Sequence, residues 1–188
     1  MRILITNDDG YQAKGIKELA DIMKEFGEVT IIAPKHHQSG MSMAVSIGFK
    51  QIAHKDFGNG WHYVDATPAS CVKFGLNTMF LDNFPDVVVS GINHGSNAAI
   101  NVIYSGTMGA CFVGAEHAIP SIGYSIDDHN PDADFSHFEP FILELTRHLL
   151  EEGMPYGICY NINAPVGALE GVRWTRQCRG FWQKEMEE

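Results

Sequence analysis

The chain has 188 residues, of which 45% are hydrophobic and 19% are charged, a composition that predicts a single globular domain over residues 1–188. Its formal net charge of −10 disfavours binding to duplex nucleic acid, and no run of lysine or arginine offsets that charge. A small anionic substrate is compatible with this charge if a metal ion supplies local positive charge.

The cysteines and the apolar segments favour a reduced, cytoplasmic protein. The four cysteines are Cys71, Cys111, Cys159 and Cys178. No two of them form a CxxC pair, so we expect free and mostly buried thiols rather than a zinc or redox site. No apolar stretch reaches the roughly 18 residues of a membrane span. Asp8 interrupts the first apolar run too early for a signal peptide.

The start of the chain predicts a strand, a helix and a second strand. Residues 2–6 form an apolar run that ends at Asn7-Asp8-Asp9-Gly10, which is typical of a buried strand followed by a polar loop. Apolar spacings of three and four over residues 16–26 predict a helix with Gly27 as its C-terminal cap. Residues 29–33 predict a second buried strand, and the short links imply that the two strands are parallel with a right-handed crossover.

The middle of the chain is less regular. Residues 48–54 and 61–65 predict a hairpin. Thr67 as N-cap and Pro68 at the first helical position predict a helix that runs to about residue 80.

The remainder of the chain again alternates between strands and helices. Residues 86–90 predict a strand that is followed by a polar loop over 91–97. The same alternation predicts a helix from about 107 to 118, a strand over 121–125, a helix over 138–149, a strand over 158–162 and the start of a strand at 174–176. Together these elements predict an α/β fold with a mostly parallel sheet.

Oxygen-bearing side chains follow three of the predicted strands. Asp8 and Asp9 follow the first strand, Ser39 follows the second, and Asn93 follows the strand over 86–90. Open α/β sheets bind ligands at this edge. Adjacent carboxylates either share a proton or hold a cation, and oxygen ligands suit Mg²⁺ or Mn²⁺. In a simpler interpretation, Asp8 and Asp9 only cap the turn that follows them.

A second candidate site precedes the helix that begins near residue 107. In Tyr104-Ser105-Gly106-Thr107, hydroxyl groups and free N–H groups at a helix start are typical of a phosphate-binding cradle, although an ordinary N-cap explains them equally well. His36 and His37 are expected to be solvated loop residues. No GxGxxG motif follows the first strand, so the dinucleotide-binding fingerprint is absent.

Four motifs in this order resemble the SurE family, the survival-protein-E nucleotidases. They are Asn7-Asp8-Asp9-Gly10, Ser39-Gly40, Ser90-Gly91-Ile92-Asn93-His94-Gly95-Ser96-Asn97 and Val102-Ile103-Tyr104-Ser105-Gly106-Thr107. The resemblance implies a Rossmann-like, three-layer α/β fold. It also implies a phosphatase that uses one divalent metal ion to hydrolyse nucleoside 5′- and 3′-monophosphates.

The same resemblance assigns roles to individual residues. It implies a metal site formed by Asp8, Asp9, Ser39 and Asn93, with Asp8 and Asp9 also as the catalytic residues. It implies phosphate contacts from Asn97, Ser105, Gly106 and Thr107. Either a bound water or an aspartate attacks phosphorus, and the sequence leaves both routes open.

The C-terminal end departs from the family pattern. Family members continue with a strand-rich extension that helps subunits to pair, and this chain lacks it. We therefore expect a homodimer or homotetramer for a chain that carries the extension. Phe181 and Trp182 lie among charged residues near the end of the chain and are expected to pack against a partner.

Two other classes of protein also place acidic residues after the first strand. A non-enzymatic, Mg²⁺-binding receiver domain would need an aspartate after its third strand, where this chain has Ser90 and Asn93. A haloacid-dehalogenase-type phosphatase would need two aspartates separated by one residue, whereas Asp8 and Asp9 are adjacent. Both alternatives rank below the nucleotidase.

Overall fold

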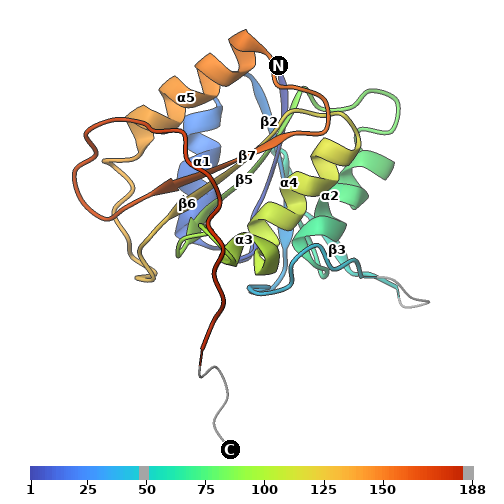
Figure 1. Ribbon diagram of the computed structural model, residues 1–188. Helices are drawn as coiled ribbons and strands as arrows, with labels where there is room; N and C mark the ends of the chain where they lie inside the picture. Colours follow the sequence, from blue (N-terminus) through green and yellow to red (C-terminus); the bar gives the residue numbers. More distant parts are fainter. Residues whose placement is uncertain (47–50, 184–188) are drawn as a thin grey trace, which may run out of the picture.

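The chain folds around a seven-stranded sheet, seen in a computed structural model that describes residues 1–46 and 51–183 (Figure 1). The strands are β1 Arg2–Thr6, β2 Glu28–Pro34, β3 His54–Asp56, β4 Trp61–Val64, β5 Val87–His94, β6 Ser121–Ile126 and β7 Cys159–Ala164. Their order across the sheet is β3-β4-β2-β1-β5-β6-β7. Neighbouring strands are parallel except for β3 and β4. The predicted α/β fold with a mostly parallel sheet is confirmed.

Helices cover both faces of the sheet, which gives the fold three layers (Figure 1). The helices are α1 Lys14–Met23, α2 Pro68–Asn77, α3 Asn101–Tyr104, α4 Gly106–Glu116 and α5 Glu139–Glu152. Side chains of α1 and α5 pack with Ile3 and Ile5 of β1, while those of α2 and α4 pack with Leu4 on the opposite face. Because strand residues alternate between faces, a central strand covered on both sides is apolar throughout. Among the described residues, no helix is long and apolar enough to cross a bilayer.

Two predicted helix ends are wrong. Helix α1 ends at Met23, so Gly27 does not cap it. Gly27 instead allows the chain to pass close to the backbone of Met1, which a Cβ atom at this position would meet. Helix α2 ends at Asn77, before the expected residue 80.

The prediction of a loop over residues 91–97, after the strand predicted at 86–90, is partly wrong. Residues 91–94 belong to β5, which continues to pair with β6 beyond a register shift between Ser90 and Asn93. Such an irregularity changes the direction in which the following side chains point. The strand is therefore longer than its apolar core, and its polar end carries Asn93 into the candidate site.

Three further differences lie at short or exposed segments. The predicted hairpin is present, but β3 begins only at His54, and residues 47–50 lie outside the described part of the chain. The short helix α3 was not predicted. Residues 165–183 contain neither helix nor strand, so the strand expected at 174–176 is wrong; Trp174 instead packs against Tyr160 of β7, with ring centroids 5.4 Å apart.

Helix α4 packs closely against its surroundings because glycines replace larger residues where it meets them. A Cβ atom at Gly109 would meet the backbone of Ser42 and Met43, and one at Gly114 would meet Val88 and Ser121. The loop that contains Ser42 also contains Ser39, so the packing of α4 helps to place a candidate site residue.

The close approach at Gly109 predicts the effect of Gly109→Ala. Helix propensity alone would make alanine more stable by about 1 kcal/mol. Because the new methyl group meets backbone atoms, we expect a loss of about 1–3 kcal/mol in the free energy of unfolding, measured by urea denaturation. Gly75→Ala in α2 is the matched control, since its methyl group would meet only the side-chain ends of Ile32 and Leu4. A gain in stability for Gly109→Ala would contradict the packing.

Candidate functional site

A cleft of about 820 Å³ lies where the loops after β1, β2 and β5 meet. The expected site residues that line it are Asp8, Asp9, Ser39, Asn93, Asn97 and Ser105. The two others, Gly106 and Thr107, lie behind Asp8, whose carboxylate contacts Thr107. Small-ligand sites have volumes of about 300–1,000 Å³. The fold thus gathers residues from distant parts of the sequence around one cleft of suitable size.

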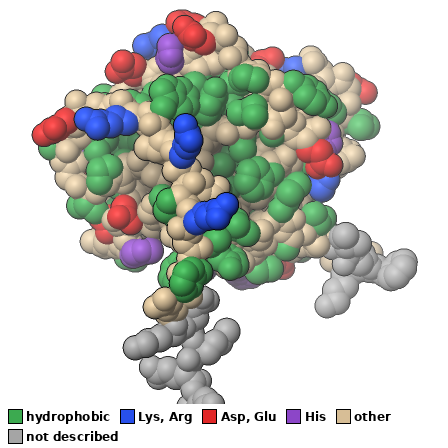
Figure 2. All heavy atoms as spheres, viewed as in Figure 1, with side chains coloured by type: hydrophobic (Ala, Val, Ile, Leu, Met, Phe, Trp, Pro, Cys, Tyr) green, Lys and Arg blue, Asp and Glu red, His purple; other side chains and the backbone are tan. Residues whose placement is uncertain are grey.

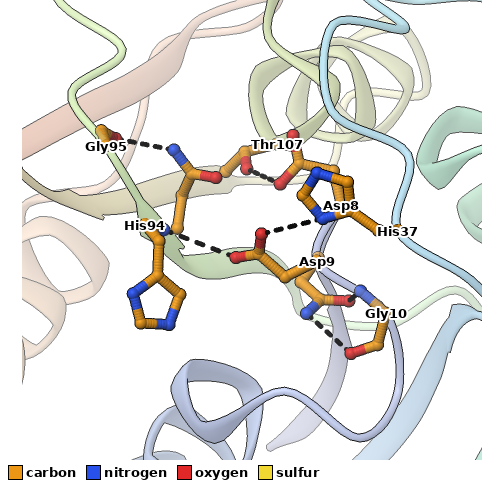
Figure 3. A network of polar contacts seen from close by, with 9 residues as sticks. Asp8, Asp9, Gly10, His37, His94, Gly95 and Thr107 are labelled. Atoms are coloured by element: carbon orange, nitrogen blue, oxygen red, sulfur yellow. Dashed lines mark hydrogen bonds and ion pairs between the residues drawn. The ribbon is translucent and has the colours of Figure 1, made fainter. Parts of the chain in front are cut away.

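Asp8 is a buried carboxylate with only 3% of its surface exposed. Its Oδ1 accepts a hydrogen bond of 2.7 Å from Thr107 Oγ1, at the beginning of α4 (Figure 3). Burial raises the pKa of Asp8 to about 6, and the charge of Asp9 adds to the rise, while hydrogen bonds from Thr107 oppose it. The fold therefore holds Asp8 in surroundings that destabilise its ionised carboxylate.

Asp9 lies between two histidines (Figure 3). Its Oδ1 is 3.4 Å from His37 Nδ1, and its Oδ2 accepts a hydrogen bond of 3.4 Å from the backbone N–H of His94.

The turn that follows β1 is closed by Asn7, whose side-chain amide forms hydrogen bonds with the backbone N–H and C=O of Gly10. The simpler interpretation, in which Asp8 and Asp9 only cap this turn, is therefore disfavoured.

Ser39 and Asn93 approach the same cleft from the loop after β2 and from the end of β5. Asn93 Nδ2 donates to the backbone carbonyl of Gly95 at 2.6 Å, which leaves its side-chain oxygen as the available ligand. The loop of Ser39 is fixed at both ends. Gln38 N–H donates to the Asp8 carbonyl at 2.7 Å, and Ser42 N–H donates to the Tyr104 carbonyl at 2.9 Å.

The chemistry of these side chains fits a hard divalent cation. The four groups offer carboxylate, hydroxyl and amide oxygens, which Mg²⁺ and Mn²⁺ prefer. Across residues 1–46 and 51–183, no cluster of three or more His, Cys, Asp or Glu side chains forms a metal site. Lys14 is the only lysine or arginine among the described residues that line the cleft, and its Nζ donates to the Ala133 carbonyl at 2.8 Å. The paired carboxylates therefore have little positive side-chain charge beside them.

Asn97 is held by a network from the edge of the sheet. Its Nδ2 donates to Ser125 Oγ at 2.9 Å, and its backbone N–H donates to Asn163 Oδ1 at 2.7 Å. Asn161 of β7 donates to the Asn97 carbonyl at 2.9 Å. Asn163 also accepts a hydrogen bond of 3.3 Å from Ser96 Oγ. This asparagine network (Asn97, Asn161 and Asn163) fixes the loop over residues 95–97 against β7.

The start of α4 contains the N-cap that the sequence offered as one of its two interpretations. Ser105 is an N-cap, and its Oγ accepts a hydrogen bond of 3.0 Å from the N–H of Met108. The hydroxyl group of Thr107 is bound to Asp8. Ser105 also lines the cleft, and the positive end of the α4 dipole lies beside it. These side chains therefore stabilise the helix start and position Asp8 beside the cleft.

Several residues that line the cleft are not predicted from the sequence, because no local pattern indicates them. His37 was expected to be a solvated loop residue; its side chain is 64% exposed, yet it contacts Asp9. Lys14, His129 and Trp182 also line the cleft. Each lies in a segment that carries no motif, and tertiary folding alone brings it to the site.

The raised pKa of Asp8 predicts how Asp8→Asn changes stability with pH. Between its ordinary pKa of 3.8 and about 6, the folded chain holds a proton that the unfolded chain releases, so Asp8 lowers stability as pH rises through this window. At pH 8 in EDTA, Asp8→Asn should be more stable than wild type by about 2–3 kcal/mol, with little of this gain at pH 3.5.

Urea denaturation at the two pH values measures this difference. Asp21→Asn, at a side chain that is 71% exposed, is the control and should not reproduce the gain. Parallel pH profiles for wild type and Asp8→Asn would show that burial does not raise the pKa of Asp8.

Comparison with known proteins identifies the family. The family model described as Survival protein SurE matches residues 3–184. The 5′-nucleotidase SurE of Bacteroides thetaiotaomicron is 41% identical over 97% of this chain and 72% of its own length, and that of Bacteroides fragilis is 42% identical over 98% and 74%. A crystal structure of the SurE protein from Aquifex aeolicus superposes with a TM-score of 0.89 and 30% identity, over 95% of this chain and 73% of the other. The chain belongs to the SurE family.

Proposed function

We propose that this protein is a divalent-metal-dependent phosphomonoesterase that hydrolyses nucleoside 5′-monophosphates, and also 3′-monophosphates, to nucleoside and phosphate. The relatives named 5′-nucleotidase SurE support the reaction class and the substrate. The observation that carries the metal requirement is the pair Asp8 and Asp9, a buried and a nearly buried carboxylate in a cleft with little positive charge. A dianionic phosphate enters such a cleft readily only when a cation offsets the carboxylates.

We assign different roles in the reaction to different residues of the cleft. Asp8, Asp9, Ser39 and Asn93 would hold the cation, which supplies polarisation of a phosphoryl oxygen and neutralisation of charge. Asp8 and Asp9 are the catalytic carboxylates, and Thr107 fixes Asp8 in place. Asn97, Ser105 and the start of α4 would bind the phosphate beside the carboxylates, where helix N–H groups favour an anion.

The receiver-domain alternative is not favoured. Its phosphate-accepting aspartate would stand at the end of β5, where the structure has Ser90, Asn93 and His94. The family match and the nucleotidase relatives also point to an enzyme. We propose nucleoside monophosphates as the partners and no binding of duplex DNA, given the net charge of −10.

Metal dependence tests the proposed function directly. We expect phosphate release from adenosine 5′-monophosphate to stop in excess EDTA and to return with Mn²⁺ or Mg²⁺. Asp9→Asn removes a charge from the cation site and should reduce turnover at least ~10²-fold, the scale of losing one group that stabilises transition-state charge.

Two results would contradict this prediction. Full activity in EDTA would exclude the metal mechanism, and wild-type turnover in folded Asp9→Asn would show that this carboxylate has no part in it. Asp21→Asn, on the outer surface of α1, is the matched control and should keep wild-type turnover.

A substitution in the asparagine network should lower activity although the substituted residue does not contact the substrate. Asn163→Ala removes the acceptor for the backbone N–H of Asn97, so the loop loses its position at the cleft. We expect kcat/KM for nucleotides to fall by up to ~10²-fold, the effect of a displacement of about 1 Å. Asn163→Asp keeps the acceptor and should recover most of the loss.

The control for this measurement is Asn77→Ala, which removes one local hydrogen bond at the end of α2. Circular dichroism should show that all three variants remain folded. Equal kinetics for Asn163→Ala and Asn77→Ala would mean that the network does not position the site.

A further inference from the structure

The C-terminal segment lies along the protein although it forms no helix or strand. Leu169 packs against the hydrophobic core on the α1 and α5 side, and Trp174 packs against Tyr160. Further along, Gly180 passes beside Ile100, with 4.0 Å between an ideal Cβ position and the Ile100 side chain. Trp182 then lines the cleft. The segment, residues 165–183, passes beside α3 (Figure 1), and its contacts bring Trp182 to the candidate site.

The cleft that Trp182 lines contains a second aromatic ring as well as polar groups. Tyr104, at the end of α3, also lines the cleft, and its surface is 52% exposed. Trp182 is 53% exposed, so its indole retains a large solvent-accessible area. Figure 2 shows hydrophobic side chains at the surface where the described C-terminal segment ends. An exposed aromatic residue at a cleft of about 820 Å³ is positioned to receive a planar group.

We propose that Trp182 is a substrate-binding residue that stacks on the base of the nucleotide. The inference rests on the proposed function, because the phosphate must lie at Asp8 and Asp9 for the base to extend along the same cleft. Base stacking tolerates different bases, since each base presents a π-face. Trp182 therefore favours nucleotides over phosphate esters that lack a base, without selecting one base.

The neighbouring residue offers a matched control. Phe181 belongs to the same segment and is 77% exposed, but it is not among the described residues that line the cleft. If aromatic character in the segment mattered only for solubility or for contact with a partner, Phe181 and Trp182 would behave alike. If the base stacks in the cleft, only substitution of Trp182 should weaken nucleotide binding.

The test compares a substrate that carries a base with one that has a hydroxyl group in its place. Adenosine 5′-monophosphate and ribose 5-phosphate present the same sugar phosphate to the catalytic end of the cleft. For Trp182→Ala we expect KM for adenosine 5′-monophosphate to rise ~5- to 150-fold, the factor that corresponds to the loss of one stacked base at ~1–3 kcal/mol. Kinetics with ribose 5-phosphate should not change. Trp182→Phe should recover most of the affinity, and Phe181→Ala should match wild type.

The outcomes separate the inference from the proposed function. Equal losses on both substrates, or equal behaviour of Trp182→Ala and Phe181→Ala, would overturn base stacking while leaving the phosphatase intact. If wild type releases no phosphate from either substrate, the proposed function fails. Calorimetric titration with adenosine 5′-monophosphate in Mn²⁺ then decides the inference separately: weaker binding to Trp182→Ala than to Phe181→Ala supports it, and equal binding overturns it.

Discussion

The burial of Asp8 next to Asp9 is the constraint on which the rest of the site depends. A carboxylate with 3% exposure and a second negative charge beside it costs free energy, which appears as a pKa raised to about 6. The surrounding structure keeps the pair in place through the hydrogen bond from Thr107 and the strands that end at the cleft. The destabilising pair lies in the cleft where we propose that the cation and the phosphate bind.

Helix α4 connects this site to the hydrophobic core. Its first residues lie against Asp8, its middle lies against the loop of Ser39, and its apolar residues pack on the sheet beside α2. Close contact is possible because glycines stand at the points of approach, so the positions of the site groups follow from packing rather than from loop flexibility. A site on such rigid elements is pre-organised, which lowers the cost of binding.

Other parts of the cleft depend on different forces. Asn161 and Asn163, on the outer strand β7, hold the loop over residues 95–97 by hydrogen bonds that connect side chains to backbone groups. The C-terminal segment reaches the cleft through a few apolar contacts, such as that of Trp174 with Tyr160. The groups around Asp8 and Asn97 are thus fixed by helix packing and amide networks, while Trp182 belongs to a segment with few contacts.

Most of the elements, and the polar residues near their ends, can be predicted from the sequence. Apolar runs such as residues 2–6 and 86–90 predict buried strands because a central strand must be apolar on both faces, and Asp8, Asp9, Ser39 and Asn93 come after such apolar runs. The contacts around these residues depend on the tertiary fold. The continuation of β5 past Ser90, the contact between His37 and Asp9, the support of Asn97 from β7 and the approach of Trp182 join residues that are distant in sequence. A local sequence pattern indicates only the preferred structure of its own segment. These contacts form when the fold brings the ends of the parallel strands to one edge of the sheet.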